Sequence, residues 1–481
     1  MQLRINDLLG NYHKLIMDPV HGGIPVSRLE VAIIDHPLFQ RLRFICQNDI
    51  LSLVFPGATH SRFLHSVGAM HVGGRMFMAM VENGLKTFGS NASVSAETLE
   101  AISYFHRIVR CACLLHDSGH SSFSHQFSRT PTIQNILSTP GIFEQLWSGE
   151  DSTQFYAEQP SALEHEHYSV RVAHHILQQG QDATEDIAPQ DIIALMETSA
   201  THATEKFSHH AKAMWPLVIG NQQSQPPEDF PELFRSLLSN IVSGELDADR
   251  ADYMLRDGFH SSVTIGSFNL DHLLSNLKFG RCSQTGWVGI GIAAKGLSSL
   301  EDFVYSRHQM YRQVYAHKTA QGFDLLLRAA IEEVMKNSEV STFIQQCLSD
   351  LEYFQHLSDS YFWEAFRRYS FRNKNSYSYC ILNRIKMPHL STKSNLSDAE
   401  LPSYIKLIAQ EHAIGEDDVI TAKLTARFTK IDDSYTAMKV LEDSEAHELM
   451  FKRISKTTQF FDQFKDDQIT HFYIDPTRVK A

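Results

Sequence analysis

The chain has few cysteines, no long apolar run and no excess of positive charge, and each absence excludes a class of protein. Its six cysteines in 481 residues include no CxxC pair, which excludes a disulfide framework and a thiol motif for zinc or redox chemistry. No stretch approaches the ~18 uncharged apolar residues of a membrane helix, and the opening residues lack the basic start and apolar run of a secretory signal. We therefore expect a cytoplasmic protein that does not bind membranes.

The formal net charge of −13 argues against nonspecific binding to nucleic acid, which depends on a positive surface. Nucleic acid is therefore not an expected partner, although a local basic pocket for a small polyphosphate stays open. Histidine is abundant, with 26 residues, seven of them between His60 and His125. Because an isolated histidine more often packs in a core than binds a ligand, it is the clustering that indicates chemistry.

Apolar residues recur every three or four positions along most of the chain, as in residues 99–117 and 296–335. This spacing predicts a mainly α protein. The best strand candidates are residues 287–295 and 420–428. Glycines in the first of these suggest a hairpin edge rather than a central strand.

Three polar, turn-rich stretches are typical of loops or linkers, namely residues 180–190, 221–231 and 388–403. The last is the candidate domain boundary. We expect a helical domain over residues 1–385 and a smaller mixed α/β region over residues 386–481, in which no motif indicates a role.

An apolar helix is predicted to end at His116 and Asp117, where Gly119 suits a helix C-terminus that needs a positive φ. An imidazole beside a carboxylate suits a divalent metal that accepts mixed N and O ligands. Such a pair is common by chance, so further ligands are needed to support a metal site.

Upstream, Arg62 and His65 are three residues apart and share one helical face, with Gly68, Gly73 and Gly74 allowing another helix to approach closely. This face presents one candidate metal ligand and one candidate phosphate contact.

Downstream, Asp249, Tyr253 and Asp257 follow one another at intervals of four and lie on one side of a predicted helix. From the residues alone, either Asp247 or Asp249 could face a metal, and the other could start the helix.

A similar stripe contains Arg307, Tyr311 and Tyr315, with Arg312 and Lys318 nearby. Cations at this spacing fit a triphosphate, and tyrosines fit a sugar or base. Taken alone, the stripe is more typical of a surface helix with solvated charges and core tyrosines.

The segments FPGATHSRFLHS, LLHDSGHSSFSH, EHEHYS, LDADRADYMLRD and YRQVYAHK occur in this order. The set resembles the HD-domain dNTP triphosphohydrolases, a family of vertebrate enzymes with an added SAM domain and bacterial homologues without one. The resemblance extends from residue 17 to residue 318. It implies an HD-domain helical core that holds one divalent ion (Mn, Fe, Ni, Co, Zn or Mg) on His65, His116, Asp117 and Asp249.

The same resemblance implies that His120, His125 and His165 are catalytic or support catalysis, with Glu166 fixing a histidine tautomer. An imidazole with a pKa near neutrality can donate a proton to a leaving oxygen. For His167 we expect a structural or solvent-facing role.

The residues implied to bind substrate are Gln47, Asn48, Arg62, Arg250, Tyr253, Asp257, Arg307, Tyr311 and Tyr315. Gln47 matches a contact to the sugar 3′-hydroxyl, whereas Asn48 stands where many relatives have leucine. Asn48 could offer a ribose 2′-hydroxyl a hydrogen bond, so ribonucleotides stay on the substrate list. Tyr315 matches a residue that crowds the 2′ position, which keeps deoxynucleotides ahead.

A nucleotide activator site is also implied, with matches at Lys14, Asp35, Gln40, Arg43, Lys295 and Lys318. Two positions depart from the family pattern, since Ala293 replaces an arginine and Met17 replaces an asparagine. The alternative is that residues 35–43 simply start a helix, with a proline in the first turn.

We therefore expect a metal-dependent phosphohydrolase that converts a dNTP to a deoxynucleoside and triphosphate, with His125 or His120 protonating the leaving oxygen. Arg62, Arg307 and Lys318 would stabilise the phosphate charge. Two alternatives stay open, namely an HD phosphohydrolase acting on another nucleotide or on single-stranded nucleic acid, and a non-catalytic nucleotide sensor. Family analogy also suggests a homo-oligomer.

Overall fold

A computed structural model describes residues 12–87, 94–148, 150–180, 187–196, 203–219, 225–282, 287–426, 438–442, 450–454, 457–461 and 466–478. Within these residues the fold is mainly α with small sheets, which confirms the predicted fold class. Parts of the predicted loops at 180–190 and 221–231 lie outside the described residues.

The helices are α2 (Arg28–Asp35), α3 (Pro37–Gln40), α4 (Arg62–Thr87), α5 (Ala96–Leu115), α6 (Ser124–Ser128), α7 (Pro131–Leu137), α8 (Ile142–Leu146), α9 (His165–Gln179), α11 (Pro189–Met196), α12 (Glu205–Ile219), α13 (Phe230–Val242), α14 (Ala248–Ser261), α15 (Leu270–Ser275), α16 (Leu297–Met310), α17 (Lys318–Met335), α18 (Ser338–Ser349), α19 (Leu351–Phe354), α20 (Asp359–Arg372), α21 (Tyr377–Leu382) and α22 (Leu401–His412). Short helical turns are η1 (Arg41–Phe44), η2 (Leu51–Leu53), η3 (Ser152–Gln154), η4 (Ala294–Gly296), the π turn η5 (Tyr311–Tyr315) and η6 (Glu416–Asp418). The strands are β1 (Tyr12–Asp18), β2 (Gly22–Ser27), β3 (Leu277–Cys282), β4 (Trp287–Ala293), β5 (His389–Ser394), β6 (Val419–Ala426), β7 (Lys439–Glu442), β8 (Met450–Arg453) and β9 (Asp467–Ile474).

Helix α4 lies at the centre of the helical core and packs against α5 and α14. The predicted close approach is present, because a Cβ atom on Gly68 would lie 1.9 Å from Asp252 Oδ1, and one on Gly73 would lie 2.5 Å from Cys113 Sγ. Any larger residue at either position would push α14 or α5 away from α4. The glycines thus bring together the three helices that carry the HD-type residues.

Helix α5 ends where its sequence predicts, since Leu115 is its last residue and His116 follows directly. The expected role of Gly119 was wrong. The positive-φ glycines among the described residues are Gly22 and Gly141. A Cβ on Gly119 would instead lie 2.2 Å from Ser169 N and 2.3 Å from His165 O, so glycine is needed to let α9 approach the HD pair.

The strand predicted at residues 287–295 is β4, which forms a hairpin with β3 but is not an edge strand. The order in its sheet is β3-β4-β7-β8, with β4 and β7 parallel, and every residue of β4 is buried. Its glycines leave room for a ring rather than marking an edge, because a Cβ on Gly289 would lie 2.6 Å from a Trp287 ring atom.

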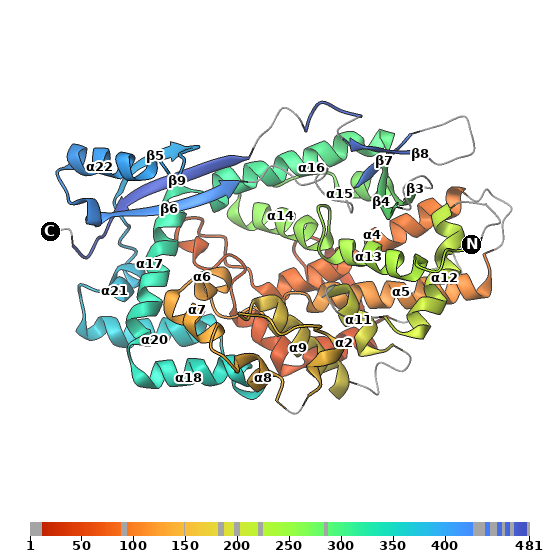
Figure 1. The fold of residues 1–481 in the computed structure, drawn as a ribbon, viewed down its shortest axis with the longest axis horizontal. Helices are drawn as coiled ribbons and strands as arrows, with labels where there is room; N and C mark the ends of the chain where they lie inside the picture. Colours follow the sequence, from red (N-terminus) through yellow and green to blue (C-terminus); the bar gives the residue numbers. More distant parts are fainter. Residues whose placement is uncertain are drawn as a thin grey trace.

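The stretch 388–403 is not wholly a linker, since it contains β5, which pairs with β9 in an antiparallel sheet of order β5-β9-β6. This sheet packs on α17 and lies at the opposite end of α16 from the sheet that contains β4 (Figure 1). Strands β7 and β8, although late in the chain, thus belong to the sheet begun by β3 and β4. The division at residue 385 stays a prediction.

In the described part of the chain, no helix combines the length and the apolar composition required to cross a membrane.

Candidate metal centre and adjoining pocket

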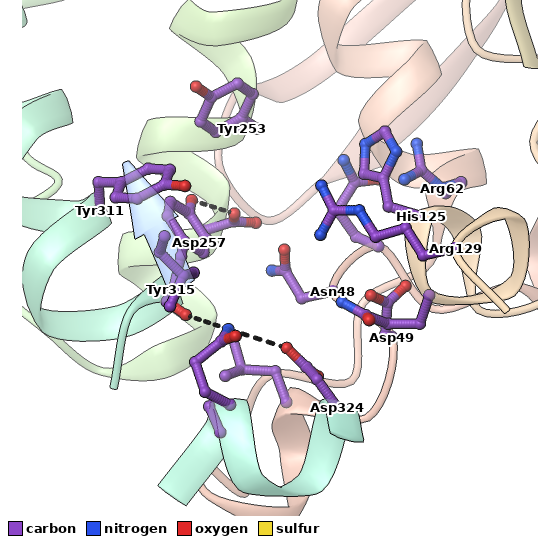
Figure 2. A pocket seen from close by; sticks show the side chains of 16 residues that line it. Asn48, Asp49, Arg62, His125, Arg129, Tyr253, Asp257, Tyr311, Tyr315 and Asp324 are labelled. Atoms are coloured by element: carbon purple, nitrogen blue, oxygen red, sulfur yellow. Dashed lines mark hydrogen bonds between the residues drawn. The ribbon is translucent and has the colours of Figure 1, made fainter. Parts of the chain in front are cut away.

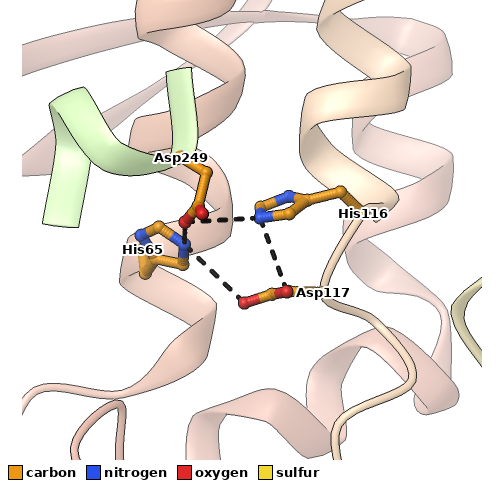
Figure 3. Close-up of side chains that lie close together, drawn as sticks. All are labelled: His65, His116, Asp117 and Asp249. Carbon is orange, nitrogen blue, oxygen red and sulfur yellow. Dashed lines mark ion pairs between the residues drawn. The ribbon is translucent and has the colours of Figure 1, made fainter. Parts of the chain in front are cut away.

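Four side chains from three helical segments meet in one cluster (Figure 3). Helix α4 contributes His65, the residues directly after α5 contribute His116 and Asp117, and the first turn of α14 contributes Asp249. One donor atom from each lies within 4.8 Å of the others. His65 Nε2 is 3.0 Å from Asp249 Oδ1, and His116 Nε2 is 3.5 Å from Asp117 Oδ1.

The Nδ1 atoms of both imidazoles make hydrogen bonds to groups outside the cluster. His65 Nδ1 donates to Asp252 Oδ2 at 2.8 Å, and His116 Nδ1 donates to the Cys113 carbonyl at 2.7 Å. The Nε2 atoms of both histidines are buried, and within the described residues they face only the carboxylates of the cluster, with Asp249 Oδ1 3.0 Å from His65 Nε2 and 3.6 Å from His116 Nε2. With Nδ1 carrying the proton, each Nε2 lone pair faces the cluster, as in histidines that bind metals. Two such nitrogens with two carboxylates fit a divalent transition metal.

Asp252 anchors this arrangement from behind His65. Its carboxylate accepts two hydrogen bonds from Arg256, at 2.9 and 2.8 Å, and one from His21 Nε2 at 2.7 Å. Arg256 also donates to Asp18 at 2.8 Å. Burial alone would raise the pKa of Asp252, but the Arg256 charge holds it well below its usual range. Asp252 therefore stays ionised and orients His65.

The structure separates the roles of the two aspartates in the LDADR segment. Asp247 caps α14, accepting from Arg250 N at 2.7 Å and from Gly244 N at 2.8 Å. Asp249 faces the cluster instead. Arg250 Nη1 also donates to Asp247 Oδ2 at 2.9 Å, which ties this predicted substrate residue to the helix cap.

Arg62 lies between the cluster and the adjoining pocket. Its Nη1 donates to Asp117 Oδ2 at 2.5 Å and its Nε donates to Ser124 Oγ at 2.7 Å. Burial alone would raise the pKa of Asp117, but His116, His120 and Arg62 hold it well below its usual range. The cluster thus keeps an ionised carboxylate for a cation, with a fixed guanidinium beside it.

The three predicted catalytic histidines stand together. His120 and His165 stack with ring centroids 3.9 Å apart, and His125 lies 5.1 Å from His120 and 5.3 Å from His165. Glu166 Oε2 is 3.0 Å from His165 Nδ1, as expected for a residue that fixes a tautomer. Asp117, His120 and His165 also form a second group whose donor atoms could hold a metal, so the two groups share Asp117.

Burial is the main cause that lowers the pKa of His125, to about 4, and the charges of Arg62 and His165 add to the effect. Its imidazole is therefore neutral near pH 7 in the free protein. His167 accepts a hydrogen bond from Glu164 N at 2.8 Å and helps to cap α9, in line with its expected structural role.

A pocket of about 320 Å³ opens beside the cluster (Figure 2). Seven of the nine predicted substrate residues line it, namely Gln47, Asn48, Arg62, Tyr253, Asp257, Tyr311 and Tyr315, together with His125. Arg250 and Arg307 are not among its lining residues. Arg307 Nη1 instead lies 3.4 Å from Glu245 Oε2.

One wall of the pocket is held by a chain of hydrogen bonds. Tyr315 donates its hydroxyl to Asp257 Oδ2 at 2.5 Å, and His60 Nε2 donates to Asp257 Oδ1 at 2.7 Å. Gln47 Oε1 and Asn48 Nδ2 are buried and have no hydrogen-bond partner in the part of the chain that the structure describes. Because an unpaired buried polar atom is costly, these two atoms indicate a polar ligand.

The chain is similar in sequence and in fold to several known proteins. A family model described as an HD associated region matches residues 271–468. The chain is 28% identical over 377 residues to the deoxynucleoside triphosphate triphosphohydrolase SAMHD1 of Bos taurus, which covers 76% of this chain and 56% of that protein. It is 27% identical over 376 residues to an uncharacterized protein of Methanocaldococcus jannaschii, covering 78% and 62% of the two chains.

This chain is a homologue of HD-domain proteins. It spans about three fifths of the length of these two curated relatives. Among solved structures, a phosphohydrolase from Bacteroides thetaiotaomicron superimposes with a TM-score of 0.61 at 21% identity, over 96% of this chain and 99% of that one. A hypothetical protein from Aquifex aeolicus gives a TM-score of 0.63 at 21% identity, over 96% of both chains. The two structures share the overall fold of this chain.

The predicted activator residues lie in three places, namely the β1-to-η1 segment (Lys14, Asp35, Gln40, Arg43), η4 before the start of α16 (Lys295) and the first residue of α17, beyond the other end of α16 (Lys318). Lys14 Nζ lies 3.5 Å from Asp35 Oδ2, and Arg43 Nε donates to Gln40 Oε1 at 2.7 Å. Within the described residues, no hydrogen bond or ion pair joins these three places. Pro37 occupies the first turn of α3, as the structural alternative requires.

The HD motifs did not reveal several residues of the pocket. Asp49, Arg129, Gln321 and Asp324 also line it, as does Leu424 from β6. Arg129 follows His125 by four residues, a spacing that could have suggested a shared face. Asp49 and Asp324 are far apart in sequence and belong to no motif, so no sequence signal pairs them.

Proposed function

We propose that this protein is a metal-dependent phosphohydrolase that hydrolyses dNTPs to deoxynucleosides and inorganic triphosphate. The observation that carries the proposal is the meeting of four metal-type donors, two of them buried Nε2 atoms that face the cluster carboxylates, beside a polar pocket. The name of the related SAMHD1 proteins, deoxynucleoside triphosphate triphosphohydrolase, supports the choice of substrate.

His65, His116, Asp117 and Asp249 would hold the ion, which would supply Lewis-acid activation of a phosphate and of water. Arg62, already fixed by Ser124, is placed to stabilise charge on the transferred phosphate.

His125 lies at the pocket face of the histidine cluster and is suited to donate a proton to the leaving 5′-oxygen of the sugar. The negative charge of a bound triphosphate would raise the His125 pKa from its low value in the free protein and so favour that role. His120, stacked on His165, is the alternative donor.

The sugar is assigned to the wall formed by Gln47, Asn48, Asp257 and Tyr315. Ribonucleoside triphosphates are the second candidate substrates, because the unpartnered Nδ2 of Asn48 could donate to a 2′-hydroxyl. Deoxynucleotides stay ahead because Tyr315, tied to Asp257, crowds that position in the family that the motifs resemble.

The proposal includes a homo-oligomer, a nucleotide activator and a cytoplasmic location. Because the predicted activator residues lie at three separate places of one chain, the proposed activator site would need residues of another subunit. The oligomer and the activator are supported by the resemblance of the sequence motifs to the HD-domain dNTP triphosphohydrolases.

Product analysis tests the proposed reaction. Protein supplied with Mn²⁺ or Mg²⁺ should convert a dNTP to equimolar deoxynucleoside and triphosphate, and the His116→Ala/Asp117→Ala variant should release neither. Adding GTP should raise the rate and the mass in solution; unchanged values would remove the activator from the proposal. Cleavage of a mononucleotide or oligonucleotide without triphosphate release would show another phosphohydrolase, and nucleotide binding without turnover would show a sensor.

A further inference from the structure

The wall that carries Tyr315 is an irregular piece of backbone. Helix α16 ends at Met310, and the π turn Tyr311–Tyr315 follows, closed by a hydrogen bond of 2.7 Å from Ala316 N to Tyr311 O. Helix α17 then begins at Lys318. Because π turns occur mostly as short interruptions at functional positions and lack the regular helical ladder, other contacts must fix this one.

Two side chains of β9 supply such contacts from the C-terminal sheet. His471 Nε2 donates to the Ala316 carbonyl at 2.9 Å, and the Tyr473 hydroxyl donates to the Lys318 carbonyl at 2.5 Å. Both side chains are buried, with residue exposures of 4% and 0%. These two hydrogen bonds therefore hold the backbone immediately after Tyr315 in place.

His471 is itself held in one tautomer. Because its Nε2 donates to Ala316, its Nδ1 must accept, and Thr392 Oγ1 of β5 donates to it at 2.8 Å. The Thr392 oxygen then accepts from His389 Nε2, also at 2.8 Å. The chain of hydrogen bonds that holds the π turn thus extends from β9 to β5.

Tyr473 also packs directly on α17, since a Cβ on Gly322 would lie 3.2 Å from its ring. In the first turn of α17, Gln321, which also lines the pocket, donates its Nε2 to the Tyr315 carbonyl at 2.8 Å. The position of the Tyr315 ring therefore depends on the joint between η5 and α17, and that joint is fastened to the sheet.

We propose that His471 and Tyr473 are positioning residues that set how Tyr315 faces the sugar, so that the C-terminal sheet takes part in discriminating deoxyribose from ribose. The inference rests on the proposed function in one respect, the assignment of the sugar to the Tyr315 wall. It assigns a role to residues 386–481, where no sequence motif indicates one.

The test compares Tyr473→Phe, His471→Phe and the double variant with wild-type protein. The matched control is Tyr377→Phe, which deletes a hydroxyl bonded to Asp475 Oδ2 at 2.5 Å, in the same part of the fold but away from the turn. For dGTP and GTP, kcat and KM are measured with metal present, together with equilibrium dissociation constants and the melting temperature.

Tyr473→Phe should lower the dGTP-to-GTP ratio of kcat/KM by about three- to tenfold, the effect of one lost hydrogen bond. The change should come mainly from a lower KM for GTP, because a displaced Tyr315 ring crowds the 2′-hydroxyl less, and the control should keep the wild-type ratio. An unchanged ratio in Tyr473→Phe and in the double variant would overturn the proposal, as would an equal loss for both nucleotides, which marks a purely structural role.

Failure of the proposed function gives a different result, since wild-type protein would then release no triphosphate. In that case the ratio of dissociation constants decides, and wild-type protein that binds dGTP and GTP equally overturns the positioning role. If His471→Phe does not fold, Tyr473→Phe still decides, because it removes one oxygen and keeps the ring.

Discussion

Asn48 is the residue at which sugar selection is most open to change. Its buried Nδ2 has no hydrogen-bond partner among the described residues, and Asn48 lines the pocket. Asn48→Leu should lower kcat/KM for ribonucleotides about tenfold while changing deoxynucleotides little, since only ribose would lose a partner. Gln47→Leu is the matched control and should weaken both, because both sugars carry the 3′-hydroxyl. Equal losses for both sugars in Asn48→Leu would contradict this role.

Asp324 makes folding depend on pH. Burial raises the pKa of Asp324 to about 7, although the charges of Arg328 and Arg129 oppose the shift. Burial also raises the pKa of Asp49, which lines the same pocket. An acid whose pKa is raised in the folded state binds its proton more tightly when the protein is folded. Ionisation of this carboxyl therefore does not lower the free energy of unfolding below about pH 4, and it lowers that free energy most above about pH 7.

Asp324→Asn should therefore gain unfolding free energy over wild type, and the gain should grow by about 2 to 3 kcal/mol between pH 5 and pH 8. Chemical denaturation at the two pH values measures it. The exposed Asp271 offers the control substitution Asp271→Asn. A gain in Asp324→Asn that does not vary with pH would show that its carboxyl does not titrate in this window.

At the residue scale, the sequence predicts a site residue where a side chain of suitable chemistry also has a helical spacing that fixes its position. The meeting of His65 with the His116–Asp117 pair could be anticipated because each lies at a defined place on a helix. The partners behind them could not, because the Asp252–Arg256 ion pair looks like ordinary helix charge until α4 packs on it.

At the scale of elements, helical periodicity predicts that a helix is present better than it predicts where the helix is interrupted. Residues 296–335 look like one amphipathic stretch, but η5 and the break after it divide α16 from α17. The break depends on β9, which lies more than a hundred residues later in the sequence, so local spacing carries no sign of it.

Glycine gave two misleading signals at this scale. The sequence suggests a positive φ at Gly119 and an edge strand at the β4 glycines, whereas in the structure these glycines make room for a close neighbour. Close approach is a tertiary property, and only at Gly68 and Gly73, where helical spacing placed small residues on one face, could the sequence anticipate it.

At the scale of the whole molecule, the late part of the chain joins the core in two places. Strand β7 extends the sheet of β4, and β9 fastens the joint beside the pocket. Residues 386–481 therefore contribute to the surroundings of the site, and whether they also form a separate domain stays a prediction. Parallel pairing of β4 with β7 could not be foreseen, because it joins segments distant in sequence.

The most direct measurement is the metal content of purified protein with two isosteric substitutions two residues apart. Elemental analysis should find one divalent ion per chain in wild type and in Asp247→Asn, whose side chain caps α14. In Asp249→Asn, whose side chain faces His65 Nε2 at 3.0 Å, the ion should be lost. Full metal content in Asp249→Asn, or loss in Asp247→Asn alone, would contradict the four-residue metal site.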